Sequence, residues 1–231
     1  MQWFESPLGS YLLEHEYRYF DKVVANIFGY NAIQIGLPQF CFLRLNRMPL
    51  QFSVGLEKTQ PALIAAADFL PIQSNSIDLA IMPHTLEFSN NPHQILREVY
   101  RVLIPEGHIV ISGFNPLSLW GISRYLKANR AEYPWNGNFI ALLRLKDWLK
   151  LLDFETMGGQ LCCYAPPFEQ EKWRKRLSFM EAAGDRWWPI GGGVYFLHAI
   201  KHMHGMRVIK PGWKKNKERK KRIVSVTQKL N

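Results

Sequence analysis

The clearest structural pattern in the chain lies in residues 66–115, which read AADFLPIQSNSIDLAIMPHTLEFSNNPHQILREVYRVLIPEGHIVISGFN. Two apolar runs, 62–69 and 77–82, each end close to a proline, and a third run at 109–111 is apolar on both faces, as buried parallel strands are. Between the second and third runs, apolar residues recur at helical spacing from Ile95 to Leu103. This order of elements predicts an α/β fold in which crossover helices join the strands of a parallel sheet.

The ends of this predicted helix carry their own signals. Asn91 is a candidate N-cap, and Pro92 stands at the first helical position, where its missing N–H costs nothing. The helical spacing places Arg97, Glu98 and Arg101 on the solvent-facing side of the helix. Residues 104–107, IPEG, suit a type I turn that leads into the next strand.

The remaining elements are predicted from the same patterns. The expected strands are 30–36, 50–56, 157–164 and 193–200, and the expected helices are 1–29, 117–127 and 139–152. Gly29 is a candidate C-cap of the leading helix. Residues 128–138 and 166–189 are expected to form insertions that cap the sheet.

Residues 66–115 resemble the second half of a class I S-adenosylmethionine (SAM)-dependent methyltransferase domain, of the methyltransferase type 11 group that includes ubiquinone/menaquinone methyltransferases. The motifs that carry this resemblance are Asp68, Leu70-Pro71-Ile72, Ser76-Ile77-Asp78, Leu86-Glu87-Phe88, Leu96-Arg97-Glu98, Arg101-Val102-Leu103 and Pro105-Glu106-Gly107. The resemblance implies a single doubly wound, seven-stranded and mainly parallel sheet over residues 1–209. It also implies that residues 1–29 either cover the active site as a lid or simply pack on the sheet.

The resemblance further implies that the chain binds SAM at the end of its first strand. In such domains this strand ends in an acid followed by a glycine-rich loop, where small residues let the backbone approach the ligand. Here Gln34 stands in the place of the acid and Gly36 in that of the first glycine, whereas Pro38 and Phe40 replace the other two glycines. The glycine loop is therefore degenerate, and Gln34 and Gly36 are the cofactor-binding candidates that it retains.

Three further cofactor contacts are implied at the ends of the second and third strands. Glu57 is the candidate for the two ribose hydroxyls, since a carboxylate accepts two hydrogen bonds. A plain surface acid is the alternative, because only residues 58–61 separate Glu57 from the third strand. Asp68 is the candidate acceptor for the adenine amino group, with Phe69 supporting the ring, and its alternative role is to cap the turn before Pro71.

The catalytic candidates follow the fourth and fifth strands. Pro83 and His84 stand where the resemblance places the cofactor's methyl group and the acceptor, and His84 has the pKa range of a general base. Asn115 is a candidate to bind the acceptor through its amide, or to cap the helix predicted at 117–127. The alternative for His84 is an ordinary hydrogen-bonding role.

Charge and cysteine usage limit the other possibilities. The chain has 231 residues and a net charge of +10, of which residues 210–231 carry +8, so a basic tail follows a nearly neutral body. The tail is either a solvated extension or a tether to nucleic acid or an anionic surface. The three cysteines do not form a disulfide framework and lack metal-ligand spacing, and no apolar run is long enough to span a membrane. These features predict a cytoplasmic protein without a metal site.

Two functions remain open on sequence grounds. The first is a SAM-dependent methyltransferase, whose methyl acceptor the sequence does not identify. The second is a methyltransferase fold without activity that serves as a binding or regulatory module, for which Gln34 and the degenerate loop are the argument. For either function, residues 210–231 are the candidate tether to nucleic acid.

Overall fold

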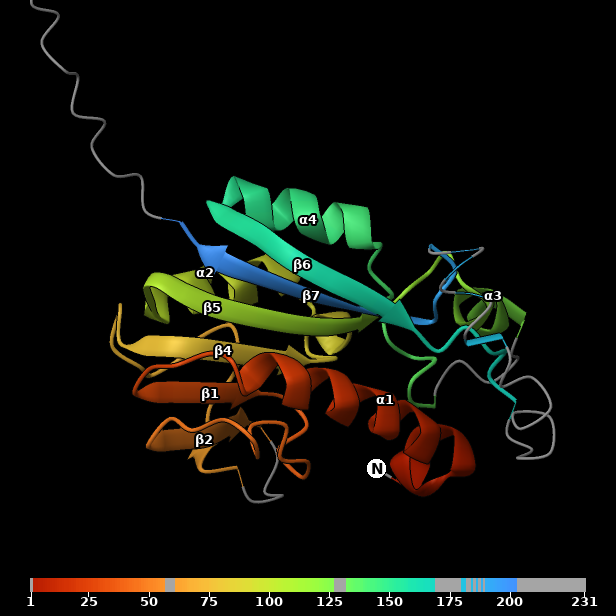
Figure 1. Ribbon diagram of the computed structural model, residues 1–231, viewed down its shortest axis with the longest axis horizontal. Helices are drawn as coiled ribbons and strands as arrows, with labels where there is room; N and C mark the ends of the chain where they lie inside the picture. The colour runs from red at the N-terminus through yellow and green to blue at the C-terminus, as the bar shows by residue number, and fades with distance from the viewer. Residues whose placement is uncertain are drawn as a thin grey trace, which may run out of the picture.

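The computed structural model of the chain describes residues 2–56, 61–126, 132–168, 180–181, 184, 186, 188 and 190–202. Seven strands form one sheet in the order β3-β2-β1-β4-β5-β7-β6, with helices on both of its faces (Figure 1). The strands are β1 (Asn31–Ile35), β2 (Leu50–Gly55), β3 (Leu63–Ile64), β4 (Ile77–Pro83), β5 (Leu103–Phe114), β6 (Phe154–Cys162) and β7 (Val194–Lys201). The helices are η1 (Gln2–Glu5), α1 (Pro7–Val24), η2 (Leu86–Phe88), α2 (Pro92–Val102), α3 (Leu119–Leu126) and α4 (Leu142–Leu151).

The sheet confirms the predicted α/β architecture. All its neighbouring strands pair in parallel except β7, which is antiparallel to both β5 and β6. The parallel pairing of β2 with β1 shows that residues 50–55 are the second strand, as predicted. The third strand is shorter than expected, because only Leu63 and Ile64 of the apolar run 62–69 pair with β2.

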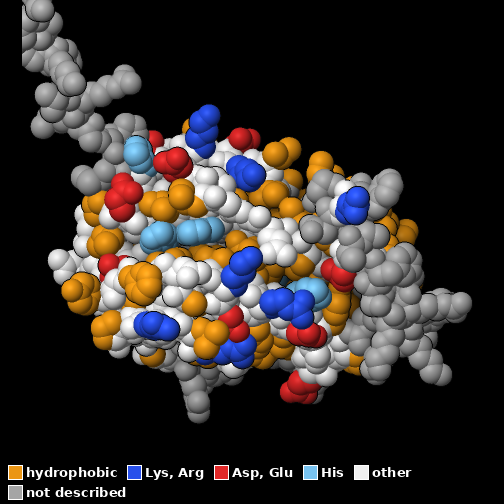
Figure 2. All heavy atoms as spheres, viewed as in Figure 1, with side chains coloured by type: hydrophobic (Ala, Val, Ile, Leu, Met, Phe, Trp, Pro, Cys, Tyr) orange, Lys and Arg blue, Asp and Glu red, His pale blue; other side chains and the backbone are white. Residues whose placement is uncertain are grey.

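Side chains that alternate along each strand divide the core into two layers. In β4, Leu79 and Ile81 pack beneath α1, whereas Ala80 and Met82 pack against α2 and α4 on the other face. The leading helix is thus part of the main core, and Figure 1 shows α1 crossing the face of the sheet toward the viewer, with α2 behind. Basic and acidic side chains are interspersed over this face, with no large area of one sign among its described residues (Figure 2).

Several predicted local features differ from the structure. The leading helix ends at Val24 with Ala25 as C-cap, so Gly29 lies beyond it. The side chain of Asn91 makes no capping hydrogen bond, although Pro92 does begin α2. Residues 104–107 interrupt the pairing of β4 with β5 and lie inside β5.

The crossover connections before β4 are reduced to loops. Residues 36–49 join β1 to β2 through turns, and β2 is joined to β3 by 56–62, of which 57–60 lie outside the described residues. The predicted helices at 117–127 and 139–152 are present but shorter, as α3 and α4. The predicted domain limits are not tested, because the tail at 210–231 and much of the insertion at 166–189 also lie outside the described residues. No helix in the described part of the chain has the length and apolarity needed to cross a membrane.

Candidate functional site at the carboxyl edge of the sheet

Parallel strands end at one edge of the sheet, and the predicted site residues gather along this edge. The loop after β1 is shaped by Gln34, a buried residue whose side chain points into the loop. Its amide nitrogen donates to the carbonyls of Gly36, Leu37 and Phe40 at 3.2, 3.0 and 2.7 Å. Its amide oxygen accepts from the N–H of Phe42 at 3.0 Å. A carboxylate has no proton to donate to these carbonyls, so the amide explains why this loop holds its shape with glutamine in the acid's place.

Gly36 is the point where the loop comes closest to the neighbouring strand. Its φ of +89° lies in the region that glycine adopts without strain. A Cβ at this position would lie 2.6 Å from the Thr85 hydroxyl oxygen. That hydroxyl donates to the carbonyl of Ile35 at 2.5 Å and contacts the Pro83 carbonyl at 3.2 Å, so it ties the ends of β1 and β4 together. The glycine therefore has a structural reason in addition to the predicted cofactor role.

Asp68 and Phe69 follow β3 and present unused groups at the same edge. Asp68 is partly exposed, and its carboxylate makes no hydrogen bond or ion pair with any described residue. Phe69 is 78% exposed, which is unusual for a phenylalanine beside a core. An acceptor next to an apolar ring is the chemistry that an adenine base requires. Glu57, the ribose candidate, lies outside the described residues.

The segment that carries Asp68 is fastened to α2 by an ion pair. The carboxylate of Glu98 accepts from the N–H of Leu70 at 3.0 Å, and Arg101 donates to the Leu70 carbonyl at 2.8 Å. Arg101 also pairs with Glu98 at 2.8 Å, and its hydrogen bonds lower the pKa of that carboxyl. The expectation that Glu98 faces solvent is therefore wrong, because its side chain turns toward the loop after β3. The side chain of Arg101 reaches the same loop and stays 35% exposed, and Arg97 is exposed as expected.

His84 is held at the end of β4 by two carboxylates. Its Nε2 lies 2.9 Å from Glu16 of α1, and its Nδ1 lies 2.9 Å from Glu87 of η2. All three side chains are almost completely buried. Glu16 also accepts from the Ser112 hydroxyl at 2.9 Å, and Glu87 accepts from the backbone N–H of Phe114, whose ring stacks on His84 at 4.1 Å.

The two acids decide the charge of this imidazole. Burial alone would lower the pKa of His84, but the carboxylates of Glu16 and Glu87 outweigh it and raise the pKa to about 10. His84 is thus an imidazolium at neutral pH: its Nδ1 is hydrogen-bonded to Glu87, whereas its Nε2 pairs with Glu16 by charge and is not aligned for a hydrogen bond with any described residue. This arrangement fastens α1 to the carboxyl edge of the sheet.

Glu16 is the residue of this cluster that the sequence interpretation missed. It lies among the apolar positions of the leading helix, together with Leu12, Tyr19 and Phe20. An acid on a core-facing stripe is costly unless it is paired, and this was the available signal. The sequence did not name its partner, because His84 lies on another element far along the chain.

Aromatic rings from four segments pack together beside the loop after β1. Phe40 packs against Phe4 of η1 at 4.9 Å, and Tyr133 contacts both Phe4 at 5.0 Å and Phe88 at 4.8 Å between ring centroids. Phe40, which replaces a family glycine, therefore turns toward the N-terminal segment. The Tyr133 hydroxyl is buried without a hydrogen-bond partner among the described residues, and burial raises its pKa.

Asn115 lies at the end of β5 with its side chain fully engaged. Its amide nitrogen donates to the carbonyls of Ile190 and Gly192 at 2.8 and 2.9 Å, and its oxygen accepts from the N–H of Leu117 at 3.1 Å. The last of these bonds forms a turn that precedes α3 (Leu119–Leu126), so the expected capping role of Asn115 is wrong: the hydroxyl of Ser118 accepts from the N–H of Gly121 at 3.2 Å and caps the helix. The other bonds attach the segment before β7 to this edge.

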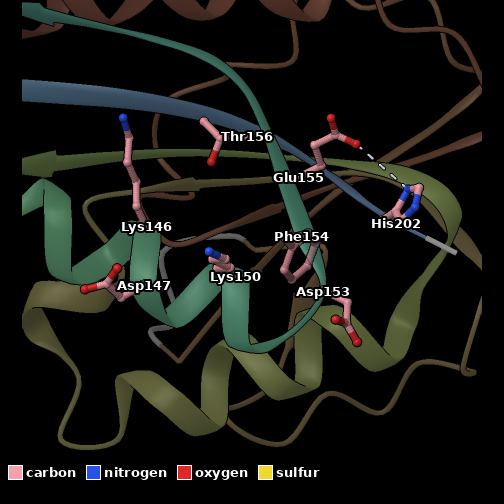
Figure 3. A pocket seen from close by; sticks show the side chains of 8 residues that line it. All are labelled: Lys146, Asp147, Lys150, Asp153, Phe154, Glu155, Thr156 and His202. Atoms are coloured by element: carbon pink, nitrogen blue, oxygen red, sulfur yellow. Dashed lines mark ion pairs between the residues drawn. The ribbon is translucent and has the colours of Figure 1, made fainter. Parts of the chain in front are cut away.

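A separate hollow at the opposite edge contains none of the predicted residues. This cavity of about 470 Å³ lies between α4 and the start of β6 (Figure 3). It is lined by Lys146, Asp147, Lys150, Asp153, Phe154, Glu155, Thr156 and His202. Figure 3 marks one ion pair among these side chains, between His202 and Glu155 at 3.9 Å. Most of the lining side chains are charged.

The match to known proteins agrees with this geometry. Residues 48–111 match the model of a family described as a methyltransferase domain. The chain is 30% identical over 174 residues to the uncharacterized protein YafS of Escherichia coli (strain K12), which covers 75% of this chain and 70% of YafS. The chain therefore belongs to the same family as YafS, and it contains a class I SAM-dependent methyltransferase domain.

Solved structures show the same fold. A SAM-dependent methyltransferase from Thermotoga maritima, described as a possible histamine N-methyltransferase, superposes with a TM-score of 0.66 at 19% identity and covers 87% of this chain and 93% of its own. A SAM-dependent methyltransferase from Archaeoglobus fulgidus gives a TM-score of 0.60 at 17% identity, covering 83% and 94%. At these identities the likeness is one of fold.

Proposed function

We propose that this protein transfers a methyl group from SAM to an acceptor at the carboxyl edge of β1, β3 and β4. The observation that carries the proposal is the pair Asp68 and Phe69, a carboxylate that no described residue bonds beside an exposed ring, at the ligand-bearing edge of an open α/β sheet. Neither side chain belongs to the hydrophobic core. Both are suited to a purine base.

The described residues fit the two ends of the cofactor differently. Asp68 would accept from the adenine amino group and Phe69 would pack on the ring, while Gly36 would let the backbone approach the methionine part. Gln34 donates its amide to the loop, which favours a role in shaping this loop over direct contact with the cofactor's amine. Glu57 remains the candidate that binds the ribose hydroxyls, and Pro83 remains the candidate that lies beside the methyl group.

Methyl transfer needs position more than proton chemistry. When bound, SAM supplies a methyl group on a sulfonium, and the acceptor attacks the methyl carbon in line with its bond to sulfur. The protein's main task is therefore to hold the two partners aligned. His84 has both nitrogens engaged by Glu16 and Glu87, and Asn115 is engaged by backbone groups. We therefore propose that both act as positioning residues, with His84 fixing the N-terminal helix over the edge where the acceptor enters.

A calorimetric titration of the full chain with SAM and with its demethylated product, S-adenosylhomocysteine, tests the proposal. Wild type should bind with micromolar affinity, and Asp68→Asn should bind about 10- to 100-fold more weakly, since a hydrogen bond to a charged group contributes about 1.5–3 kcal/mol. Asp153→Asn is the matched control, because Asp153 precedes β6 at the opposite edge and asparagine tolerates its positive φ. Equal affinity in wild type and Asp68→Asn would contradict the assignment of Asp68.

A second function is favoured by the loop after β1. Phe40 and Pro38 stand where small residues usually face the cofactor, and Gln34 lacks the charge of an acid. If wild type binds neither ligand at millimolar concentration, the fold is a scaffold for a binding or regulatory module. RNA binding that loses its salt dependence when residues 210–231 are deleted would assign such a role to the tail. The free thiols favour a cytoplasmic location for either function.

A further inference from the structure

A histidine and two cysteines from distant parts of the chain meet between α1 and the end of β6. One ring nitrogen of His15 and the sulfur atoms of Cys162 and Cys163 all lie within 4.8 Å of one another. Both cysteines are buried and unoxidised, and His15 is half-buried. Among the described residues this is the only group of three His, Cys, Asp or Glu side chains arranged as a metal site would be.

The backbone at the end of β6 explains how two adjacent cysteines face one point. Successive side chains of a strand point to opposite faces. Cys163, however, leaves the strand with a φ of 59°, and its carbonyl is held by the N–H of Gly193 at 3.0 Å. This turn brings the two sulfur atoms to 3.5 Å. A left-handed conformation is strained for a residue other than glycine, and here it produces a vicinal dithiol.

The sulfur separation suits a shared metal ion. Two thiolates bound to tetrahedral zinc at ~2.3 Å are separated by roughly 3.8 Å. The observed 3.5 Å is close to this value, whereas the sulfur atoms of a disulfide are only about 2.05 Å apart. An imidazole nitrogen within the same small volume completes a Cys₂His ligand set, which is typical of zinc and other thiophilic metals.

We propose that His15, Cys162 and Cys163 bind one zinc ion, with the fourth coordination position open to the groove beside them. The groove has a volume of about 290 Å³ and is lined by His15 and Cys162 together with Glu181, so it provides a path for the ion. Binding exchanges the two thiol protons for the metal, and both protons leave to solvent. The two thiolates neutralise the charge of the zinc ion, and the carboxylate of Glu181 offsets one of the two positive charges of Arg18 and Lys22, which also line the groove.

The groups next to the proposed ligands are themselves held in place. Glu181 accepts from the hydroxyl of Tyr11 and, at 3.1 Å, from the N–H of Ala165, so its carboxylate is fixed beside the cysteines. The ring of Tyr11 packs on that of His15 at 4.7 Å and restricts its rotation. Such contacts orient ligands before the metal arrives.

The sequence interpretation expected no metal site, because the cysteines lack the usual ligand spacing. That expectation considered cysteine pairs along the chain, whereas the third ligand of this cluster comes from α1. The ion would join α1 to the end of β6, next to the point where Glu16 joins the same helix to β4. Zinc would therefore stabilise the position of the helix that covers the carboxyl edge.

Metal titration of the reduced full chain tests the site directly. With a phosphine reductant, which supplies no thiol ligand, wild type should take up one Zn²⁺ in competition with a chromophoric chelator. Co²⁺ in place of zinc should give the intense ultraviolet charge-transfer band of a thiolate–cobalt bond. Cys162→Ser and Cys163→Ser should each weaken Zn²⁺ binding more than about 100-fold, since even outer partners of metal ligands contribute 10- to 100-fold.

Cys41→Ser is the matched control, because Cys41 is exposed and lies outside the cluster. It should keep the affinity and the cobalt band of the wild type. Loss of binding in Cys41→Ser, or equal binding in all the variants, would overturn the proposal. The wild-type cobalt spectrum does not depend on how well the variants fold, so a wild type without the charge-transfer band would also overturn it.

Discussion

Replacing His84 by asparagine should destabilise the protein and remove part of its pH dependence. Asparagine is the appropriate substitute, because His84 has a φ of 47° and asparagine tolerates this left-handed conformation. The change leaves the carboxylates of Glu16 and Glu87 buried beside each other without their shared cation. The Tyr133 hydroxyl, whose pKa is raised by burial and by these acids, is neutral and does not replace it.

The magnitude follows from the raised pKa of His84. Below pH ~6.5 the imidazole is protonated in both the folded and the unfolded chain, so its stabilisation is fully present. As the pH rises toward the folded-state pKa of about 10, only the unfolded chain loses the proton, and the stabilisation is progressively lost. The free energy of unfolding should therefore fall by about 1.4 kcal/mol per pH unit, or about 2 kcal/mol between pH 7.5 and 9.

Urea denaturation followed by tryptophan fluorescence at several pH values measures this effect. At pH 6.5 His84→Asn should be about 3–5 kcal/mol less stable than wild type, as expected when one member of a buried charge pair is removed. The difference should shrink as the pH rises, because only the wild type loses the histidine contribution. Groups remote from this cluster titrate alike in both proteins and cancel in the comparison.

His202→Asn is the control, since His202 is an exposed histidine at the end of β7. It should keep the wild-type pH dependence. If His84→Asn is too unstable to measure, Glu16→Gln leaves His84 with one carboxylate and should end the pH-dependent loss at a lower pH. A difference between wild type and His84→Asn that stays constant from pH 6.5 to 9 would refute the reasoning.

Three further substitutions test the carboxyl edge. Gly36→Ala should lower the free energy of unfolding by about 1–3 kcal/mol in thermal denaturation, because it combines a positive φ with a contact of 2.6 Å to Thr85. Gly158→Ala is the control: open space surrounds this position, so stability should change by less than about 0.5 kcal/mol. Gln34→Ala should lower the free energy of unfolding by about 2–4 kcal/mol in urea and weaken SAM binding, since it removes the bonds that shape the loop; an unchanged affinity would separate the loop from the cofactor. Asn115→Ala should cost about 1–3 kcal/mol, and an unaltered melting temperature would show that its hydrogen bonds are dispensable.

The central strands and α2 could be predicted because their signals are local. The run 77–82 is buried on both faces, and the spacing of Ile95, Leu96 and Val99 defines one face of a helix. The third strand could not be delimited in this way. Its run is rich in alanine, which does not favour strands, and only Leu63 and Ile64 find a partner at the edge of the sheet.

The contacts of the candidate site were harder to predict, because they join distant segments. Asp68 was proposed as a site residue from its place after a strand, and no described residue bonds its carboxylate. The engagement of His84 by Glu16 depends on how α1 crosses the sheet, which no local pattern specifies. The meeting of His15 with two cysteines likewise depends on the left-handed turn at Cys163.

Hydrogen–deuterium exchange with and without S-adenosylhomocysteine tests most directly whether this edge holds the cofactor. The full chain should show slower amide exchange in peptides covering residues 36–42 and 66–70 when the ligand is saturating, because a bound nucleoside stabilises both loops. Exchange that stays unchanged in these peptides at millimolar ligand, or that slows only around residues 146–156 at the opposite edge, would contradict the proposed SAM site.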